Sequence, residues 1–297
     1  MTNNRTVPLR WAAVAATVVG IAGCGPLPSP TPGGPATTPS TVETSATGAT
    51  VVSVPVYFLG IERHWQEADG QPVERIKLYR EFHRVPAADG GLQAKTHAAV
   101  TAMLDGHTLD PDYRTGWPDG ARVRSVAVGD DTATVDLAGA ATNSVGAEAA
   151  QQTVEQLIWT ATAASGKSGI RLLLDGEPAS DLWGHVSVGG VLRRAKALDT
   201  LASVWLIDPQ HGATVGRTFA LHVSGATFES TIQLRVRQGD RTVSQKYVTV
   251  STTSTGRFGE AKTTFTLSPG GYVIEAYAES AVDGRVAFLD DHSITVS

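Results

Sequence analysis

The segment from Trp11 to Cys24 constrains this chain most, because it decides in which compartment the rest of the chain folds. Arg5 and Arg10 precede a largely apolar stretch of eleven residues, and small residues follow immediately before Cys24. A basic start, a short apolar stretch and a small-residue cleavage site are typical of a secretory signal. A membrane-spanning helix needs about 20 apolar residues, so this stretch is too short to cross a bilayer. We therefore predict that residues 1–23 are a signal peptide.

The sequence Ile21-Ala22-Gly23-Cys24 resembles the lipobox of bacterial prolipoproteins. The resemblance implies that a diacylglycerol, with palmitate as an acyl chain, is attached to the Cys24 thiol, and that cleavage leaves Cys24 as the new N-terminus. Two acyl chains hold a protein stably at a membrane, whereas one binds only marginally. We therefore expect a lipid-anchored protein on the outer face of the cytoplasmic membrane, in the cell envelope. The alternative is an ordinary signal peptide cut near Ala22, with Cys24 an incidental free thiol.

The segment after the cysteine has the composition of a tether. Twenty of the 26 residues from 25 to 50 are Pro, Thr, Ser or Gly, which cannot bury enough apolar surface to fold. The prolines favour an extended chain that spans roughly 80 Å at about 3.1 Å per residue. We predict that residues 24–50 are a lipidated cysteine followed by a disordered tether, acting as a passive spacer.

Composition excludes two classes of protein. Cys24 is the only cysteine, so no intramolecular disulfide can form and stability must come from packed cores. The net charge of −5 lacks the basic excess that neutralises phosphates, which argues against nucleic acid as a partner. No cofactor is indicated.

Residues 51–199 are predicted to form an α+β domain. Residues 51–59 are β-branched and aromatic, which predicts a strand. Residues 74–84 alternate, which predicts a half-buried strand with Ile76, Leu78 and Phe82 on one face and Lys77, Glu81 and His83 on the other. Further strands are expected at residues 122–128, 132–137 and 169–174.

Helical spacing marks two helices in the same domain. In residues 92–105 the apolar set is Val100, Met103 and Leu104, and Gly106 follows as a stop. A continuous apolar stripe marks the second helix: Ala147, Ala150, Val154, Leu157, Ile158 and Ala161. Asn143 or Ser144 is expected to cap its start and Gly166 to end it. The element order predicts an α/β sandwich, a mixed sheet with two helices on one face.

This domain resembles the GerMN domain of bacterial envelope and sporulation proteins. The matching segments are residues 54–59, 78–80, 103–106, 117–120, 133–137, 156–160 and 173–178. His107 departs from the family, in which Pro often follows the glycine, so the local turn is open to difference. The resemblance implies an envelope assembly or binding module, related in fold to ring-building domains. It brings no catalytic residues.

Residues 200–297 are predicted to form an all-β, immunoglobulin-like sandwich. About seven short strands are separated by turns rich in Gly and Ser, with no helical pattern. The segments 208–215, 223–226, 228–230 and 279–284 resemble the Gmad domain, which follows GerMN in germination-associated proteins. The resemblance implies a role in sporulation or germination. The Ala- and Thr-rich composition instead resembles that of an actinobacterial envelope protein.

Two sequence patterns suggest ligand sites but have simpler explanations. Residues 161–168 satisfy a relaxed P-loop pattern, yet a helix precedes them and a strand follows, so we interpret the match as chance. His107 with Asp110, Asp112 and Asp119 suggests a metal loop, but position 12 counted from Asp110 is not the Glu of an EF-hand. We interpret these carboxylates as solvated and predict no metal site.

The remaining acid–histidine cluster is Asp290-Asp291-His292, in a predicted alternating strand. The chain has no HExxH, no Cys–His ligand set and no GxSxG, so it supports neither a zinc hydrolase nor a serine hydrolase of the elbow type.

Tryptophans are candidates for stacking on glycan rings. Trp159 lies beside the helical stripe and is expected in the core. Trp117 and Trp183 sit near Pro or Gly in loops and are the candidate binding residues, against the simpler role of packing. No catalytic residue is assigned.

We therefore predict a membrane-anchored, extracytoplasmic lipoprotein that is not an enzyme and presents binding or assembly modules to peptidoglycan or envelope proteins. Two alternatives stay open. A wall-active hydrolase would use paired carboxylates, which sequence spacing does not exclude. A glycan or solute receptor would need a formed pocket.

Overall fold

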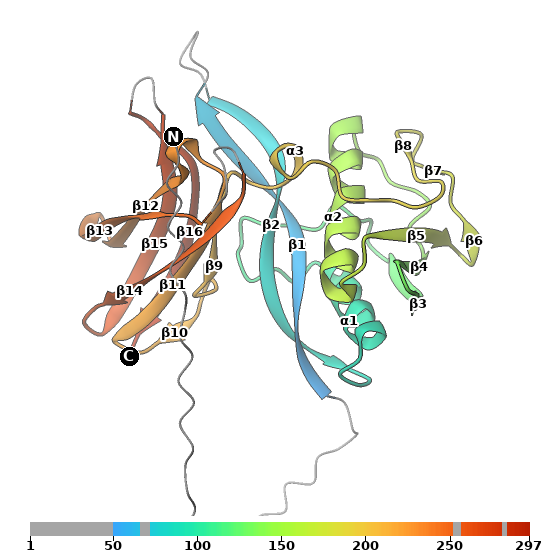
Figure 1. Ribbon diagram of the computed structural model, residues 1–297, viewed down its shortest axis with the longest axis horizontal. Helices are drawn as coiled ribbons and strands as arrows, with labels where there is room; N and C mark the ends of the chain where they lie inside the picture. Colours follow the sequence, from blue (N-terminus) through green and yellow to red (C-terminus); the bar gives the residue numbers. More distant parts are fainter. Residues whose placement is uncertain (1–49, 66–71, 252–256, 281–283) are drawn as a thin grey trace, which may run out of the picture. The chain divides into compact units, whose positions relative to one another are not determined.

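The computed structural model describes residues 50–65, 72–251, 257–280 and 284–297. They form an α/β region (residues 50–202) followed by a β-sandwich (residues 203–297), as Figure 1 shows. The predicted fold class, an α/β sandwich with a mixed sheet and two helices followed by an all-β sandwich, is confirmed. No helix within these described residues is long and apolar enough to cross a membrane.

The α/β region begins with a long antiparallel ribbon. Strand β1 (Thr50–Trp65) pairs along its whole length with β2 (Pro72–Ala87). The backbone of Tyr57 on β1 bonds to α2 (Ala147–Ser165): its N–H donates to Thr160 Oγ1 over 3.1 Å, and its carbonyl accepts from Gln156 Nε2 over 2.9 Å. Polar side chains of the helix therefore satisfy the edge of the ribbon.

The two main helices end as the sequence predicts. Helix α1 (Leu92–Asp105) stops at Gly106 and α2 at Gly166, both in the left-handed conformation that glycine adopts without strain. Helix α2 begins at Ala147, where the predicted stripe begins, but the predicted cap is wrong, because the N-cap is Gly146. The Asn143 side chain instead donates to the carbonyl of Gly116 over 3.0 Å.

The remaining large strands form a mixed sheet with the order β3-β4-β5-β6. Its strands are β3 (Arg122–Val128), β4 (Thr132–Ala138), β5 (Gly169–Leu174) and β6 (Glu177–Pro178). β4 and β5 are parallel, joined through α2, and the other neighbours are antiparallel. Three short elements follow: β7 (Asp181–Leu182), β8 (Val186–Ser187) and α3 (Ala197–Thr200).

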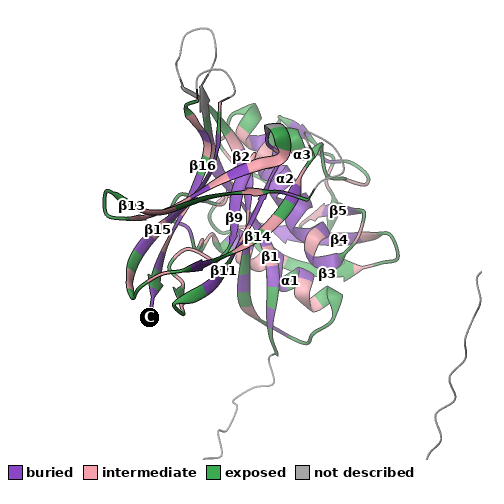
Figure 2. Cartoon of the chain, turned by 60° about the vertical axis from the view of Figure 1, so that its left-hand side comes forward, coloured by how far each residue is buried: buried purple, intermediate pink, exposed green. Residues whose placement is uncertain are grey.

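The expected single sheet is divided in two, and the helices lie between the ribbon and the mixed sheet (Figure 1). Because it has a sheet on each side, α2 is buried almost all round from Thr153 to Ser165, not along one stripe only (Figure 2). The sequence pattern missed this because several of the buried positions are polar. Several of them bond to other segments of the chain, as when Arg194 Nε donates to Thr162 Oγ1 over 2.7 Å.

The predicted faces of β2 are also wrong in part. Lys77, Glu81 and His83 are buried, while Phe82 is 37% exposed. The ammonium of Lys77 donates to the carbonyls of Leu198 and Asp199, both over 2.9 Å. The alternating pattern predicts that the polar face of this strand is exposed, whereas the structure buries it. A pattern within the strand does not show which distant segments will bond to its polar side chains.

The β-sandwich has a five-stranded sheet, β10-β16-β15-β12-β13, and a three-stranded sheet, β14-β11-β9. The strands are β9 (Val204–Asp208), β10 (Thr214–Val215), β11 (Thr218–Gly225), β12 (Thr231–Gln238), β13 (Arg241–Thr249), β14 (Gly259–Thr266), β15 (Gly270–Glu279) and β16 (Val286–Val296). Its one described helical turn is the 3-10 segment Phe228–Ser230. A second apolar core lies between the two sheets.

Strand β9 belongs to both cores. Val204 and Leu206 pack in the core of the β-sandwich, while Trp205 and Ile207 pack in the core of the α/β region. All four side chains are at most 3% exposed. Because successive side chains of a strand point to opposite faces, one short strand joins the two hydrophobic cores.

Candidate functional site

The predicted anchor lies outside the described residues. This applies to Ile21, Ala22, Gly23 and Cys24, and to the tether up to residue 49. Their roles stay predictions.

The two candidate tryptophans lie together in the α/β region. Trp117 is 4% exposed, and its ring meets that of Trp183 edge-on at 5.5 Å between centroids. Trp183 is half-buried and donates its Nε1–H to the carbonyl of Ala140 over 2.9 Å. Trp159, expected in the core, is buried there. The ring of Trp117 therefore has no face open to a glycan, and we do not propose these residues as a binding site.

The P-loop-like residues 161–168 span the C-terminal end of α2, where Gly166 N–H donates to the carbonyl of Thr162. A helix N-terminus for phosphate is therefore not formed there, in agreement with the interpretation of the pattern as chance.

The four residues of the suspected metal loop separate. His107, Asp112 and Asp119 are exposed, whereas Asp110 is 2% exposed. The interpretation as solvated carboxylates is therefore wrong for Asp110. His107 lines a different hollow of about 310 Å³ between β2 and α1, together with His83 and His97.

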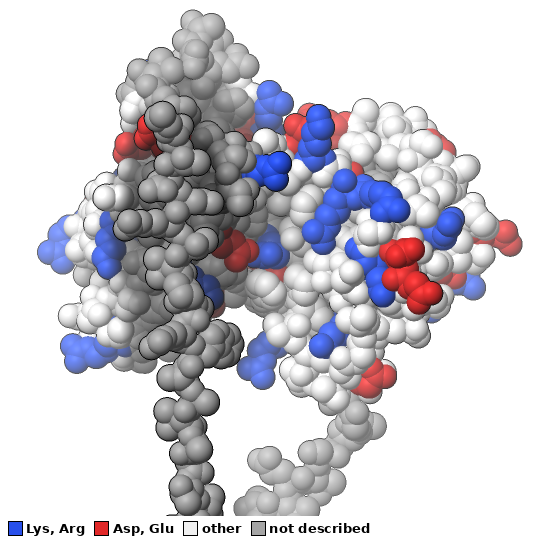
Figure 3. Space-filling view, viewed as in Figure 1, with Lys and Arg blue, Asp and Glu red and all other residues white. Residues whose placement is uncertain are grey.

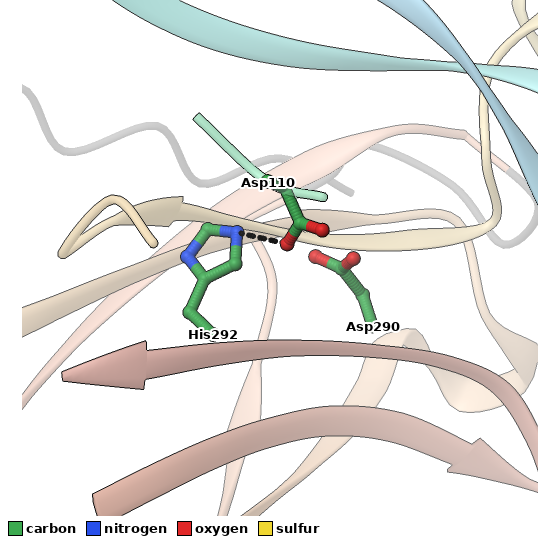
Figure 4. Close-up of side chains that lie close together, drawn as sticks. All are labelled: Asp110, Asp290 and His292. Carbon is green, nitrogen blue, oxygen red and sulfur yellow. Dashed lines mark ion pairs between the residues drawn. The ribbon is translucent and has the colours of Figure 1, made fainter. Parts of the chain in front are cut away.

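Asp110 meets the other acid–histidine cluster of the sequence. Asp290 and His292 lie two positions apart on β16, so both point to the same side of the strand. One ligand atom from each of Asp110, Asp290 and His292 lies within 4.8 Å of those of the other two. Figure 4 shows the two carboxylates and the imidazole pointing toward one another. All three side chains are buried.

Each oxygen of Asp290 accepts a strong hydrogen bond. The Tyr113 hydroxyl donates to Oδ1 over 2.6 Å, and the Leu206 N–H donates to Oδ2 over 2.6 Å. Burial raises the pKa of Asp290 to about 8, while these two bonds oppose the rise and the charge of Asp110 adds to it. At neutral pH the folded protein therefore keeps a proton on this carboxyl.

The carboxylate of Asp110 is held from two directions. The Asp112 N–H donates to Oδ1 over 2.8 Å, and His211 Nδ1 lies 3.2 Å from Oδ2. Burial raises the pKa of Asp110, and the Asp112 bond and the two histidines oppose that rise.

The imidazole of His292 has a defined orientation. Its Nδ1 lies 2.7 Å from the carbonyl of Pro209, which only accepts, so Nδ1 carries a proton. Its Nε2 lies 3.7 Å from Asp110 Oδ2. Burial lowers the pKa of His292, although the Pro209 bond opposes the shift, so the ring is neutral and Nε2 presents a lone pair to the carboxylates.

Glu81 holds the loop that carries Asp110. Its carboxylate accepts from the N–H groups of Leu109 and Asp110, at 3.0 and 2.8 Å, and lies 2.6 Å from His83 Nε2. The buried polar face of β2 therefore positions the first member of the cluster.

The arrangement can hold a proton or a cation, but it does not suit sugar hydrolysis. Paired carboxylates of glycosidases lie about 5–9.5 Å apart across an open cleft, so that the sugar fits between them. Asp110 and Asp290 are 2% and 5% exposed and their nearest oxygens are closer than that. A glycan cannot be placed between them.

Sequence reasoning could not join this cluster, because Asp110 and Asp290 are separated by 180 positions along the chain. The one available signal was the spacing of Asp290 and His292, which places an acid and an imidazole on one face of a strand. The burial of Asp110 depends on Glu81, a contact that no local pattern shows.

Family models match both the α/β region and the β-sandwich. Residues 55–180 match the Germane family, described by sporulation and spore germination. Residues 203–285 match Gmad2, an immunoglobulin-like domain of bacterial spore germination. A search of curated proteins finds no match.

Solved structures are similar over about half of the chain. A Clostridium perfringens protein classed as a lipoprotein is 18% identical, with a TM-score of 0.33, covering 50% of this chain and 93% of that one. The tandem GerMN domains of the sporulation protein GerM from Bacillus subtilis are 15% identical, with a TM-score of 0.36, covering 52% of this chain and 50% of that one.

These likenesses are distant, and the family matches carry the assignment. Together they cover most of the described α/β region and β-sandwich, in the order expected from the sequence. The chain is thus built from a domain of the Germane family followed by an immunoglobulin-like domain of the Gmad2 family.

Proposed function

We propose that this protein is a lipid-anchored component of the cell envelope that presents its two domains as one non-catalytic binding or assembly unit. The observation that carries the proposal is the order of features along one chain. A lipobox-like sequence ending at Cys24 precedes a Germane domain and a Gmad2 domain, and both families are described by sporulation or spore germination.

Two features of the structure support a single presented unit. Trp205 and Ile207 of β9 anchor the Gmad2 domain in the core of the Germane domain. The segment between the domains is also fixed, because Ala202 N–H donates to the carbonyl of Leu78 over 3.0 Å. The two domains are therefore presented to a partner in one fixed relative orientation.

Other features support a binding role over a catalytic one, and argue against nucleic acid as the partner. The acid–histidine cluster is buried, so it offers no open site to a polymer. Acidic and basic side chains are intermixed on the face of the α/β region shown in Figure 3. The partner is an envelope protein or the wall itself.

The anchor is tested by comparing the wild-type chain with Cys24→Ala in membrane and soluble fractions of a bacterial host. Wild type is expected in the membrane fraction, carrying labelled palmitate. Cys24→Ala is expected to lose the label and leave that fraction. A variant that keeps the label, or stays in the membrane after a high-salt wash, would contradict the anchor.

The binding role is tested with purified cell-wall sacculi and the unlipidated Cys24→Ala chain. Pelleting with sacculi and no release of soluble fragments is the result expected of a wall-binding unit. No pelleting directs the search to a protein partner through cross-linking in the membrane. Release of soluble wall fragments would overturn the non-catalytic proposal.

A further inference from the structure

The buried cluster of Asp110, Asp290 and His292 has the donor set of a metal site. It offers two carboxylates and one imidazole nitrogen. His292 is 2% exposed, its Nδ1–H is fixed on the carbonyl of Pro209, and its Nε2 faces Asp110 Oδ2 at 3.7 Å. An imidazole whose other nitrogen donates to a backbone carbonyl is the usual form of a histidine ligand.

The spacing of the donor atoms suits a small cation. Ligands at about 2.0–2.2 Å from a tetrahedral zinc ion lie about 3.4 Å from one another. His292 Nε2 and Asp110 Oδ2 are 3.7 Å apart, and all three donors lie within 4.8 Å. Small side-chain movements therefore bring the three donors to coordinating distance.

The charge of the cluster also favours a cation. Among the described residues no Lys or Arg forms an ion pair with Asp110 or Asp290; the two ion pairs of Asp110 are with His211 and His292. Buried carboxylates that lack a cationic partner are costly. A dication placed between them would neutralise both carboxylates, with release of the proton that Asp290 keeps in the metal-free protein.

The carboxylates are already held in position by other groups. Tyr113 and Leu206 donate to Asp290, and Asp112 and His211 to Asp110. Each carboxylate oxygen has a second lone pair, so these bonds leave capacity for a metal. Such supporting hydrogen bonds orient the ligands in metal sites.

We propose that Asp110, Asp290 and His292 bind one divalent transition-metal ion of the zinc type. The imidazole nitrogen favours zinc-like ions over magnesium and calcium, which prefer all-oxygen sites. Asp110 lies within the residues that match the Germane family, whereas Asp290 and His292 lie on β16 of the β-sandwich, the last strand, which follows the residues that match Gmad2. The ion therefore ties the two domains together, which goes beyond the presentation of two modules and does not depend on the lipid anchor.

The test uses the full-length chain carrying Cys24→Ala, so that the thiol cannot bind zinc. The protein is stripped with a chelator, dialysed and titrated calorimetrically with zinc chloride, and bound metal is counted by elemental analysis. We expect saturable binding at the cluster, and at least tenfold weaker binding of Mg²⁺ and Ca²⁺.

Two variants and a matched control locate the site. Asp290→Asn keeps an acceptor for the Leu206 N–H but removes the carboxylate that would bind the ion. His292→Asn keeps a donor for the Pro209 carbonyl but removes Nε2. Each is expected to weaken zinc binding at least tenfold. The control is His222→Asn, which changes a histidine paired with Glu260 at 2.9 Å elsewhere in the Gmad2 domain and is expected to leave binding unchanged.

The wild-type titration decides the question even if a variant fails to fold. Less than one equivalent of bound zinc in the folded chain would overturn the proposal and leave the cluster as a protonated hydrogen-bond network. Equal binding by wild type and both folded variants would also overturn it, by placing the zinc elsewhere, such as the histidine-lined hollow beside α1.

Discussion

The interiors of the two domains and the junction between them are built from different chemistry. Each interior is an apolar cluster, centred on residues such as Leu157 in the Germane domain and Leu234 in the Gmad2 domain. The junction combines the apolar side chains of β9 with buried hydrogen-bonded ionisable groups, among them Tyr113 and Asp290. Apolar contacts are non-directional, whereas hydrogen bonds depend on angle. The interiors therefore set the stability of each domain, and the polar contacts set how one domain meets the other.

A second polar contact at the junction also helps to set how one domain meets the other. Arg80 of β2 reaches Glu260 of β14 over 3.0 Å, and its guanidinium lies 6.0 Å from the ring centre of Trp205. His222 Nε2 approaches the same carboxylate at 2.9 Å. Glu260 is partly exposed, so this contact adds orientation more than stability.

The largest expected effect tests whether the shared strand makes one cooperative unit. Leu157→Ala and Leu234→Ala each remove a fully buried side chain from a different interior, at a cost of about 2–5 kcal/mol. Because β9 contributes to both cores, we expect a single unfolding transition that either variant shifts to lower denaturant concentration. The measurement is urea unfolding followed by tryptophan fluorescence and circular dichroism.

An exposed leucine provides the control for that comparison. Leu198→Ala changes a side chain that is 53% exposed, and the midpoint is expected to stay nearly unchanged. Two separate transitions, each moved by only one core variant, would contradict the coupling through β9 and make the domains independent.

The interiors were largely predictable from sequence, because their signals are local. The stop of α1 at Gly106, the hairpin of β3 and β4, and the strand at β5 follow from spacing and turn residues. The strand run of the Gmad2 domain has the same local character. Periodicity and turn chemistry act within a few residues, so a single sequence contains them.

The junction was not predictable, because each of its contacts joins distant segments. Glu81 reads as a solvent-facing residue in an alternating strand, and its partners Leu109 and Asp110 follow a helix further along the chain. The burial of Asp110 then depends on the Gmad2 domain, through His211 and His292. The sequence does not show whether the hydrogen-bonding groups of a polar residue will bond to water or to another domain.

A smaller effect is expected where a directional contact of the junction is cut. Tyr113→Phe removes the hydroxyl that donates to buried Asp290, which leaves one carboxyl oxygen without that partner. Such a loss costs about 1–3 kcal/mol. The free energy of unfolding of the metal-free protein measures it.

The same chemical change away from the junction gives the matched control. Tyr272→Phe removes a hydroxyl that donates to the carbonyl of Ser268 over 2.9 Å, within the Gmad2 domain. We expect a smaller cost of about 0.5–1.5 kcal/mol, because Ser268 is exposed and water can replace the lost hydroxyl, whereas Asp290 is buried. Equal costs would mean that the Tyr113–Asp290 hydrogen bond contributes no more to stability than the Tyr272–Ser268 hydrogen bond does.

The smallest effect concerns an ionisable group inside one domain, away from the acid–histidine cluster. Glu155 on α2 is 4% exposed and accepts the Ala195 N–H over 3.1 Å. Burial raises its pKa above the ordinary value of 4.5, against the Ala195 bond and the charge of Arg194. The folded state therefore keeps this proton to higher pH than the unfolded state, so its contribution to stability falls as pH rises above about 4.5.

Glu155→Gln removes that pH dependence while keeping an acceptor for Ala195. We therefore expect the stability of the variant, relative to wild type, to be lowest at about pH 4.5 and to rise toward about pH 8, by less than the effects above. Urea unfolding across this range measures the trend, with Glu148→Gln, an exposed acid on the same helix, as the control for the loss of charge. A relative stability that falls with pH, or an equal rise in the control, would show that burial of Glu155 is not the cause. Glu155 would then be no more costly inside the domain than an exposed acid is on the surface.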